Sequence, residues 1–433
     1  MNAADIAPVP PEKRTQSGID LFLIYAGANI VATTLVTGAS LVPAFSTTAA
    51  LVLIGTGSLL GAGLVAALAP LGPRFGAPSV ILARAALGLR GAQFLAVLLY
   101  LTNFAWIALN NVIAASACAR IWGGPAAERP WAVGLGLLAT LVVALGPRAV
   151  GWADRLAVPV MAGVGLLLLA RCLGLPPAVF TAQGDGSQSL LRGLDVVVGY
   201  QVSWILMFAD YSRYTRGERR SALGVFLGLG LSSLWFMPLG LLAARAAGSS
   251  DPGALMSVLG LGASGALLLA LATLNTNFVN IYLSALAFKS LRPAASERLS
   301  VWSIGALGAL LSLLSRTWLD RYADFMLILG SLLVPAGGIL LARFFLMRPG
   351  VDVPALYQAP AGASRDLAWR AAAAWGLGTL VYFAAAPIGG TLPALLTAVL
   401  AYALFTTKTP GTQRNSTDNA TTETQRREGT VRV

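Results

Sequence analysis

Two stretches, Tyr25-Ala-Gly-Ala-Asn29 and Gly199-Tyr-Gln-Val-Ser-Trp204, place glycine and polar residues near the middle of long apolar runs. A helix inside a bilayer cannot leave backbone N–H and C=O groups unpaired unless they face protein or a water-filled cavity. A glycine-marked polar interruption in the first run, repeated in the sixth, therefore indicates a ligand or ion site at the middle of a membrane.

The composition places the chain among membrane proteins. Hydrophobic residues make up 56% of its 433 residues and charged residues only 11%, whereas a soluble domain carries about 25% charged residues. We therefore expect an all-α polytopic membrane protein with twelve transmembrane helices. The apolar runs that predict them span residues 19–43, 47–70, 91–121, 130–147, 154–174, 190–210, 220–246, 262–289, 300–315, 322–347, 367–385 and 389–407.

The net charge of +12 raises the question of a nucleic-acid partner. Most of the Lys and Arg residues fall in alternate loops, a distribution typical of membrane orientation, and it predicts a multi-pass protein of the cell (inner) membrane with both termini cytoplasmic. No basic run with interleaved aromatic residues occurs, so no nucleic-acid binding is expected.

The residues that usually hold metals or relay protons are scarce. The chain has no histidine, and its two cysteines, Cys118 and Cys172, lie in apolar surroundings without a CxxC spacing. We expect small core residues there, not a disulfide or a metal site. Asp20, Asp195 and Asp210 lie near the ends of spans. Coupling to Na⁺ is therefore favoured over coupling to H⁺, although Asp195 is only about one turn from Gly199.

Uncharged polar residues are grouped in the third run, where Tyr100, Asn103, Trp106 and Asn110 share one helix face. Such a stripe can simply join helices through side-chain hydrogen bonds. The functional alternative is that the Trp ring stacks on a planar ligand while an amide bonds it.

A second group lies in the eighth run. Thr273, Thr276, Asn277, Asn280 and Ser284 share one face there, with Asn275 beside them. Helix packing is one explanation. The other is a cation site, since hard cations prefer the oxygen ligands that hydroxyl, amide and freed backbone groups supply. In the sixth run, Trp204 suits either a membrane interface or a pocket wall, and the amide of Gln201 needs partners.

Two loop segments carry a resemblance to a known family. The stretch from Gly72-Pro-Arg-Phe-Gly76 through Ala83-Arg-Ala-Ala-Leu-Gly-Leu-Arg-Gly91 resembles the loop between helices 2 and 3 of the nucleobase:cation symporter-1 family. Phe208-Ala-Asp-Tyr-Ser-Arg-Tyr-Thr-Arg216 resembles the family pattern after helix 6. The resemblance is closest to hydroxymethylpyrimidine and cytosine permeases.

The resemblance implies a LeuT-like fold, with a five-plus-five inverted repeat and two peripheral helices. The expected organisation is a cytoplasmic N-terminal tail (1–17), a transporter domain (18–407) and a disordered cytoplasmic tail (408–433). Within the domain the repeats would span about 19–174 and 190–347, with extra helices in 367–407. Asp210 and Arg213 are expected to form an ion pair or helix-end contacts at the inner gate.

The resemblance also implies roles for individual residues. Trp106 matches a stacking Trp, Asn103 an amide that contacts the ring, and Asn277 a substrate-binding Asn. A gapless match puts Gln201 on the opposite wall, with Tyr200 and Trp204 as substitutes. The complete substrate-binding set is Gly27, Ala28, Asn103, Trp106, Tyr200, Gln201, Trp204, Asn277 and Asn280.

The cation ligands implied by the family are backbone carbonyls at the first interruption and in the eighth run, together with two side chains. Asn275 stands where relatives often have a hydroxyl residue. The complete set is the carbonyls of Gly27, Ile30 and Ala272 and the side chains of Asn275 and Thr276.

These features together predict a secondary-active symporter that imports a planar pyrimidine-type compound with Na⁺ or H⁺. Hydroxymethylpyrimidine and cytosine are the expected substrates. The expected partners are this small heterocycle and the lipid bilayer, with no obligate protein partner and no cofactor beyond the coupling ion. The alternatives are a purine, allantoin or uracil permease of the same family and an amino-acid transporter of the same fold. A membrane enzyme is disfavoured because no catalytic constellation is found, and a channel is least favoured.

Overall fold

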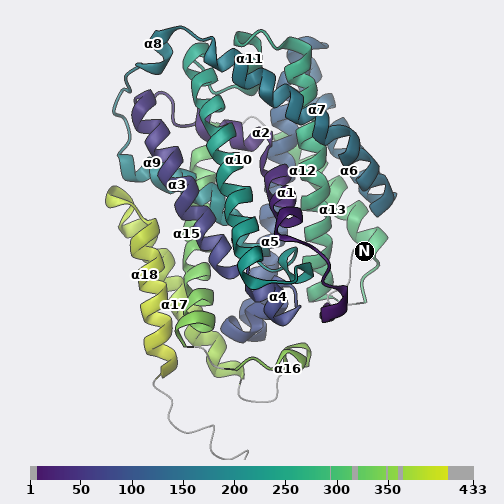
Figure 1. The fold of residues 1–433 in the computed structure, drawn as a ribbon, viewed down its shortest axis with the longest axis vertical. Coiled ribbons are helices and arrows are strands. Elements are labelled where there is room, and N and C mark those ends of the chain that lie inside the picture. Colours follow the sequence, from purple (N-terminus) through teal and green to yellow (C-terminus); the bar gives the residue numbers. More distant parts are fainter. Residues whose placement is uncertain (1–6, 293, 315–319, 348–349, 359–363, 408–433) are drawn as a thin grey trace, which may run out of the picture.

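The computed structural model describes residues 7–292, 294–314, 320–347, 350–358 and 364–407, and these form helices throughout (Figure 1). Residues 408–433, where a disordered tail is expected, lie outside the described residues. Each of the twelve predicted runs falls on a helix or on a pair of consecutive helices, so the all-α prediction is confirmed. In chain order these are α1 (Gly18–Asn29) with α2 (Ala32–Ala39), α3 (Thr47–Leu68), α5 (Ser79–Ile121), α6 (Glu128–Ala144), α7 (Pro147–Leu173), α9 (Leu190–Val202) with the 3₁₀ helix η3 (Ser203–Met207), α10 (Glu218–Ala247), α12 (Gly262–Leu291), α13 (Glu297–Leu311), α15 (Tyr322–Leu341), α17 (Ser364–Ala384) and α18 (Thr391–Thr407).

The helices differ in length: some are long enough to cross a membrane, and short elements cover the two ends of the bundle. Among the described residues, eight helices are long and apolar enough to cross a membrane, and the bent pair α1/α2 makes a ninth. Two further apolar helices, which include most of α13 and α18, are shorter. The short elements are η1 (Pro11–Lys13), α4 (Leu71–Phe75), η2 (Pro125–Ala127), α8 (Pro177–Phe180), η4 (Ser212–Tyr214), α11 (Pro252–Val258), η5 (Ser312–Leu314), the π-helical η6 (Ala342–Leu346), α16 (Val353–Tyr357) and η7 (Ala386–Ile388).

The first span is broken where the sequence predicts an interruption. Helix α1 ends at Asn29, the backbone leaves the helical region at Ile30 and Val31, and α2 continues at an angle of 61°. Both linking residues are β-branched, and such residues favour extended backbone over helix. The break therefore leaves backbone groups of a spanning helix available inside the bundle.

The sixth span changes helix type instead of bending sharply. Helix α9 ends at Val202 and the chain continues directly as the 3₁₀ helix η3 from Ser203. A stretch of 3₁₀ helix inside a span often marks a functional hinge. The two interrupted spans are the first of each expected half, which agrees with an inverted repeat. The pairing of 19–174 with 190–347 stays a prediction.

Close packing between α2 and α10 holds the broken span in the bundle. A Cβ atom at Gly38 would lie 1.9 Å from the Met237 carbonyl oxygen, and one at Gly240 would lie 1.9 Å from that of Leu35. Small residues let membrane helices approach this closely. Alanine at either glycine would force the two helices apart.

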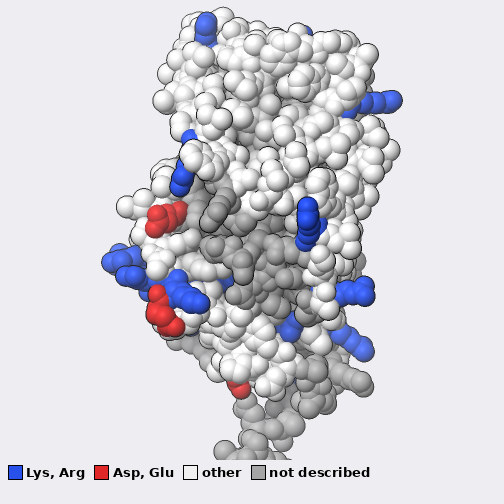
Figure 2. All heavy atoms as spheres, turned by 90° about the vertical axis from the view of Figure 1, so that its right-hand side faces the viewer, with Lys and Arg blue, Asp and Glu red and all other residues white. Residues whose placement is uncertain are grey.

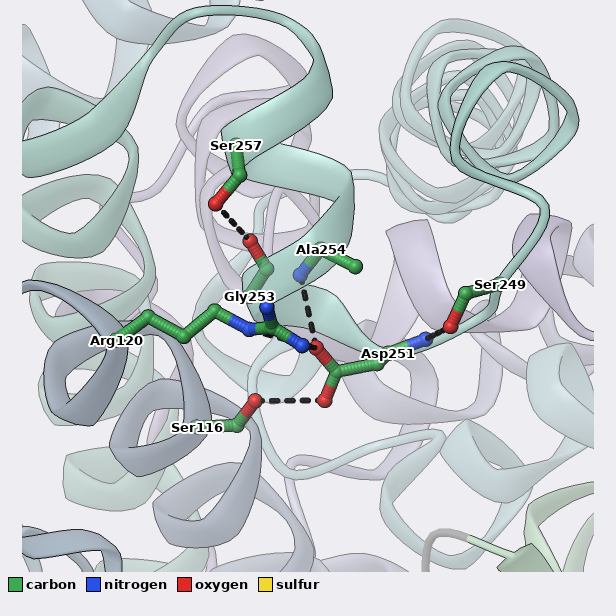
Figure 3. A network of polar contacts seen from close by, with 7 residues as sticks. All are labelled: Ser116, Arg120, Ser249, Asp251, Gly253, Ala254 and Ser257. Carbon is green, nitrogen blue, oxygen red and sulfur yellow. Dashed lines mark hydrogen bonds and ion pairs between the residues drawn. The ribbon is translucent and has the colours of Figure 1, made fainter. Parts of the chain in front are cut away.

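One end of the bundle is closed by a network around α11 (Figure 3). Arg120 of α5 donates to Asp251 Oδ1 from Nε (3.1 Å) and Nη2 (2.7 Å), while Ser116 donates to Oδ2 at 2.9 Å. The same Asp251 carboxylate accepts from the N–H of Ala254 and so caps the N-terminus of α11. The network fixes this short helix against α5.

The two loop segments that carry the family resemblance meet at the opposite end, the lower one in Figure 1. Ser212 donates to the Ala69 carbonyl at 2.8 Å, and the N–H of Ala209 donates to Ser79 Oγ at 2.8 Å. Gly72 lies so close to Ser212 that a Cβ would come within 2.0 Å of its Oγ. Two segments far apart in sequence therefore form one packed unit.

The N-terminal segment lies across this unit. The N–H of Val9 donates to the Gly76 carbonyl and that of Gln16 to the Tyr214 carbonyl, both at 2.9 Å. Nearby, Arg74 and Glu218 form an ion pair at 2.6 Å. On the face drawn in Figure 2, Lys and Arg gather mainly in the lower half, and most of the remaining surface is uncharged.

Candidate functional site

A pocket lies at the break between α1 and α2. Its walls come from the broken span, from α5, from the junction of α9 with η3, and from α12. Every residue that lines it is uncharged. A neutral ligand is therefore favoured, because an uncompensated charge is costly in such surroundings.

Most of the substrate-binding residues predicted from the sequence converge on this pocket. The predicted residues that line it are Ala28, Asn103, Trp106, Tyr200, Trp204 and Asn280, together with Thr276 from the predicted cation set. The predicted residues outside its lining are Gly27, Ile30, Gln201, Ala272, Asn275 and Asn277. Their roles stay predictions.

Aromatic side chains form two walls of the pocket. Trp106 of α5 is held by Tyr200, with ring centroids 5.9 Å apart, and by Phe325 of α15 at 5.4 Å. Trp204 of η3 packs against Tyr25 of α1 at 5.3 Å. Both indoles are thus positioned by neighbouring rings while they line the same space, which suits a flat aromatic ligand.

Two amide groups in the lining lack protein partners. Asn103 is 1% exposed and Asn280 is 6% exposed. Neither Nδ2 atom has a hydrogen-bond partner among the described residues. Buried N–H groups are rarely left unpaired, so these two amides are suited to donate to ligand acceptors.

Two residues of the predicted cation site, Ala272 and Thr276 of α12, lie beside the break. Val31 packs in one buried cluster with Ala272 of α12. Thr276 Oγ1 donates to the Ala272 carbonyl at 2.8 Å and also lines the pocket. Gly27 is half-buried with open space around it, and Asn275 is half-buried. Hydroxyl and carbonyl oxygens thus lie beside the break, as a hard cation requires.

A separate ladder of asparagines joins α5 to α12. Asn110 donates to Asn277 Oδ1 at 3.3 Å, and Asn277 donates to Asn111 Oδ1 at 2.8 Å. Asn111 in turn donates to Ser312 Oγ at 3.0 Å. Such bonds satisfy buried amides between membrane helices, so this ladder has the character of a structural contact. Among the side-chain atoms of the three ladder asparagines, only Asn110 Oδ1 is buried without a partner in the part of the chain that the structure describes.

Gln201 points away from the pocket, toward α10. Its Nε2 donates to Ser233 Oγ at 2.8 Å, and the amide nitrogen of Asn29 donates to the same oxygen at 2.7 Å. The stretch that contains Asn29 was predicted to interrupt the first span, but no role was expected for Asn29 itself. Its position at the end of an interrupted span was the signal that could have indicated one.

The buried carboxylate of Asp195 also points away from the pocket. It accepts from the N–H groups of Gly390 (2.7 Å) and Thr391 (3.1 Å), at the start of α18. An anion at a helix N-terminus is favourable. Asp195 therefore ties α9 to α18, and the possibility that it approaches the pocket is not supported by this geometry.

The expected helix-end contacts of Arg213 are present. Its Nε donates to the Asp210 carbonyl at 3.3 Å, and its guanidinium also reaches the Ala7 carbonyl and the Tyr214 hydroxyl. The two cysteines, Cys118 and Cys172, are buried and free, as expected.

Hydrogen bonds and ring contacts hold the lining residues Tyr200 and Trp204 against neighbouring helices. The Tyr200 hydroxyl lies 2.6 Å from Thr34 Oγ1, and the Tyr322 hydroxyl lies 2.7 Å from Thr37 Oγ1. Tyr25 packs between Trp204 and Tyr211. Phe325 was not predicted, because an isolated aromatic residue in an apolar span carries no local signal. Tyr25 belongs to the stretch predicted as an interruption, but no role was expected for its ring.

A pocket at a broken spanning helix, inside an all-helical bundle, is typical of membrane transporters. The chain belongs to the family of permeases for cytosine/purines, uracil, thiamine and allantoin, which its residues 8–405 match. This confirms the nucleobase:cation symporter-1 family expected from the two loop segments.

Relatives and solved structures agree with this assignment. The cytosine permease of Escherichia coli (strain K12) is 24% identical over 355 residues, which cover 79% of this chain and 80% of the relative. Mhp1, a nucleobase-cation-symport-1 family transporter solved in a closed conformation with bromovinylhydantoin bound, has a TM-score of 0.79 at 19% identity and covers 94% of this chain and 96% of its own. MhsT in complex with L-phenylalanine has a TM-score of 0.59 at 17% identity, over 88% of this chain and 98% of its own. At these identities the structures show the fold, and the expected polytopic transporter fold is confirmed.

Proposed function

We propose that the protein is a secondary-active symporter that imports a neutral pyrimidine-type ring, cytosine or hydroxymethylpyrimidine, with a coupling cation. The observation that carries this proposal is the uncharged pocket lined by Trp106, Trp204 and two unpaired amides. Indole faces suit a flat ring, and amides suit its polar edge.

The donor pattern of the pocket favours a ring with an acceptor edge. The free Nδ2 groups of Asn103 and Asn280 donate hydrogen bonds, so they match a carbonyl oxygen beside an unprotonated ring nitrogen. A site built to bond a polar group discriminates strongly against a ligand that lacks it. Cytosine carries such an edge, and it is also the named substrate of the relative from Escherichia coli.

Cation coupling is supported by the residues around the break. We propose Na⁺ as the coupling ion, bound by the carbonyls of Gly27, Ile30 and Ala272 and by the side chains of Asn275 and Thr276. Hydroxyl, amide and carbonyl oxygens are ligands for a hard cation. The Asp195 carboxylate accepts hydrogen bonds at the start of α18, away from the pocket, and this supports Na⁺ over H⁺. Coupling to H⁺ is the alternative.

Contacts around the pocket suggest how access alternates. We assign one closure to the contacts of Tyr200, Tyr322 and Phe325, and the other to the ring contacts of Tyr25 with Trp204 and Tyr211. Opening one closure at a time exposes the site to one side only. We place both termini in the cytoplasm of a cell-membrane protein because positive residues favour that side.

Uptake into proteoliposomes tests the proposal. Radiolabelled cytosine and hydroxymethylpyrimidine are supplied with an inward Na⁺ gradient, an inward H⁺ gradient or neither, and unlabelled uracil, purines, allantoin and amino acids compete. We expect cation-driven uptake that pyrimidines inhibit most. Preferential inhibition by purines, allantoin or uracil would reassign the substrate within the family. Inhibition by amino acids alone would contradict the proposal.

A further inference from the structure

A second polar cluster lies behind the pocket, on the α10 side of the broken span. It combines side chains from the ends of α1 and α9 with a pair of serines in α10. Asn29, Gln201 and Ser233 are 0% exposed, and Ser232 is 3% exposed. Nothing in the proposed nucleobase or cation sites uses this cluster.

The contacts within the cluster are short and converge on α10. Asn29 Nδ2 lies 2.8 Å from Ser232 Oγ, 2.7 Å from Ser233 Oγ and 3.3 Å from the Leu229 carbonyl oxygen. Gln201 Nε2 lies 2.8 Å from the same Ser233 Oγ and 3.5 Å from the same carbonyl. Two amides from different spans therefore share one hydroxyl.

Two acceptor atoms of the cluster are left unpaired. The Ser232 hydroxyl donates to the Gly228 carbonyl of its own helix. Asn29 Oδ1 and Gln201 Oε1 find no hydrogen-bond partner among the described residues. Two buried acceptor atoms without donors need an occupant that is positive or donates hydrogen bonds, and an anion is excluded.

The helix ends around the cluster favour positive charge. Asn29 is the last residue of α1, and Gln201 lies in the last turn of α9. The C-terminal end of a helix carries a partial negative charge from its unpaired carbonyls, which stabilises a nearby cation. Two such ends meet here, inside a region from which water is largely excluded.

The ligand chemistry points to a small monovalent ion. The available oxygens are two amides, two hydroxyls and one backbone carbonyl, and none of them is a carboxylate. Neutral oxygens suit a hard ion of low charge better than a divalent one. Within the described ranges, the structure holds no group of three or more His, Cys, Asp or Glu that could bind a metal ion.

We propose that Asn29, Gln201, Ser232 and Ser233 form a Na⁺ site, distinct from the one proposed beside Ala272 and Thr276. The two sites lie on different sides of the break, one against α10 and the other against α12. An ion in the α10 site holds the ends of α1 and α9 to the same helix. It therefore favours the arrangement in which both walls of the nucleobase pocket are in place.

Direct Na⁺ binding to the purified full-length protein, without any nucleobase, tests this site. We would measure the stoichiometry and affinity of radioactive Na⁺, with choline replacing Na⁺ to hold ionic strength constant. We expect more than one Na⁺ per chain. Ser233→Ala and Gln201→Leu should each lower the stoichiometry by one, while Thr276→Ala should leave the α10 site occupied. Monodispersity on gel filtration shows that each variant is folded.

A charge substitution gives an independent readout that does not depend on loss of binding. Gln201→Glu adds a carboxylate of similar shape, so it should raise the Na⁺ affinity by about tenfold, since charge on the ligands tunes cation affinity. Asn111→Asp is the matched control, because its amide is also buried but is engaged in the ladder with Asn277 and Ser312. It should leave Na⁺ affinity unchanged.

The outcomes separate this site from the proposed function. A single Na⁺ that disappears in Thr276→Ala overturns the α10 site, as does Na⁺ binding that Ser233→Ala, Gln201→Leu and Gln201→Glu all leave unaltered. The latter result assigns a water molecule to the cluster. Failure to transport pyrimidines would not affect these measurements, because no nucleobase is present.

Discussion

The same two helices, α5 and α12, carry asparagines in two opposite situations. Asn103 and Asn280 have buried amide nitrogens without protein partners and line the pocket. Asn110 and Asn111, about two turns further along α5, bond Asn277, which lies about one turn before Asn280 on α12. The comparison teaches that an amide in a membrane helix indicates a ligand only where its bonds are left open. Where they are closed, it joins helices.

The largest effect on uptake should come from loss of Trp106, the aromatic wall of the pocket on α5. Trp106→Ala removes the α5 face of the pocket, and loss of such a central aromatic contact costs about 3 kcal/mol, or about 100-fold. Initial uptake rates at low cytosine concentration would measure it. Trp152→Ala is the control, because Trp152 is 71% exposed and should tolerate the change. Near-normal uptake by Trp106→Ala would exclude stacking on this ring.

Loss of an unpaired pocket amide should weaken ligand binding without lowering the stability of the protein. Asn280→Ala removes a donor that bonds nothing else in the described protein, so KM should rise about tenfold, the value of one hydrogen bond of about 1.4 kcal/mol. Thermal unfolding in detergent should be little changed. A fall in melting temperature with an unaltered KM would show that Asn280 joins helices, as the ladder asparagines do, and does not bind the ligand.

Loss of an amide from the asparagine ladder should lower the stability of the protein and leave ligand binding almost unchanged. Asn277→Ala leaves groups of Asn110 and Asn111 unpaired, and each such loss costs about 1–3 kcal/mol in stability. We expect a lower melting temperature and a KM within about twofold of the unmodified protein. A KM that rises as much as in Asn280→Ala, with normal stability, would restore the family-implied substrate role of Asn277 and break the comparison.

Thr276 shares features of both situations, because it bonds the Ala272 carbonyl and also lines the pocket. Thr276→Ala should raise the Na⁺ concentration that gives half-maximal uptake by about tenfold, since one oxygen ligand is lost. The isosteric Thr276→Val tests whether shape alone accounts for the change. An unchanged Na⁺ dependence in both variants would remove Thr276 from the cation site.

The smallest effect is expected at the buried carboxylate that faces away from the pocket. Asp195→Asn keeps an oxygen for the start of α18 but loses the charge, which should cost about 0.3–1 kcal/mol in stability. The pH dependence of uptake should be unchanged. A shift of that pH dependence would make Asp195 a proton carrier and favour H⁺ coupling.

Much of the candidate site could be predicted from the sequence. Trp106 and Asn103 were identified by their spacing and by family resemblance, and the break after Asn29 was placed by its glycine and polar neighbours. Phe325 and Ser233 could not be predicted, because a single aromatic or serine in an apolar span has no periodic context. The orientation of Gln201 was also beyond the sequence, since a one-residue difference from Tyr200 turns a helical side chain by about 100°.

By itself, the sequence determined the class of the protein, its helices and its family. Low charge and long apolar runs leave a spanning helix as the structure that satisfies every backbone group in lipid, and this demand is local. Only the tertiary structure decided which polar side chains are paired. The partner of Asn110 is 167 residues away and that of Asp195 is 195 residues away. Whether a buried hydrogen-bonding group is satisfied depends on which helices lie beside it, and no local pattern contains that information.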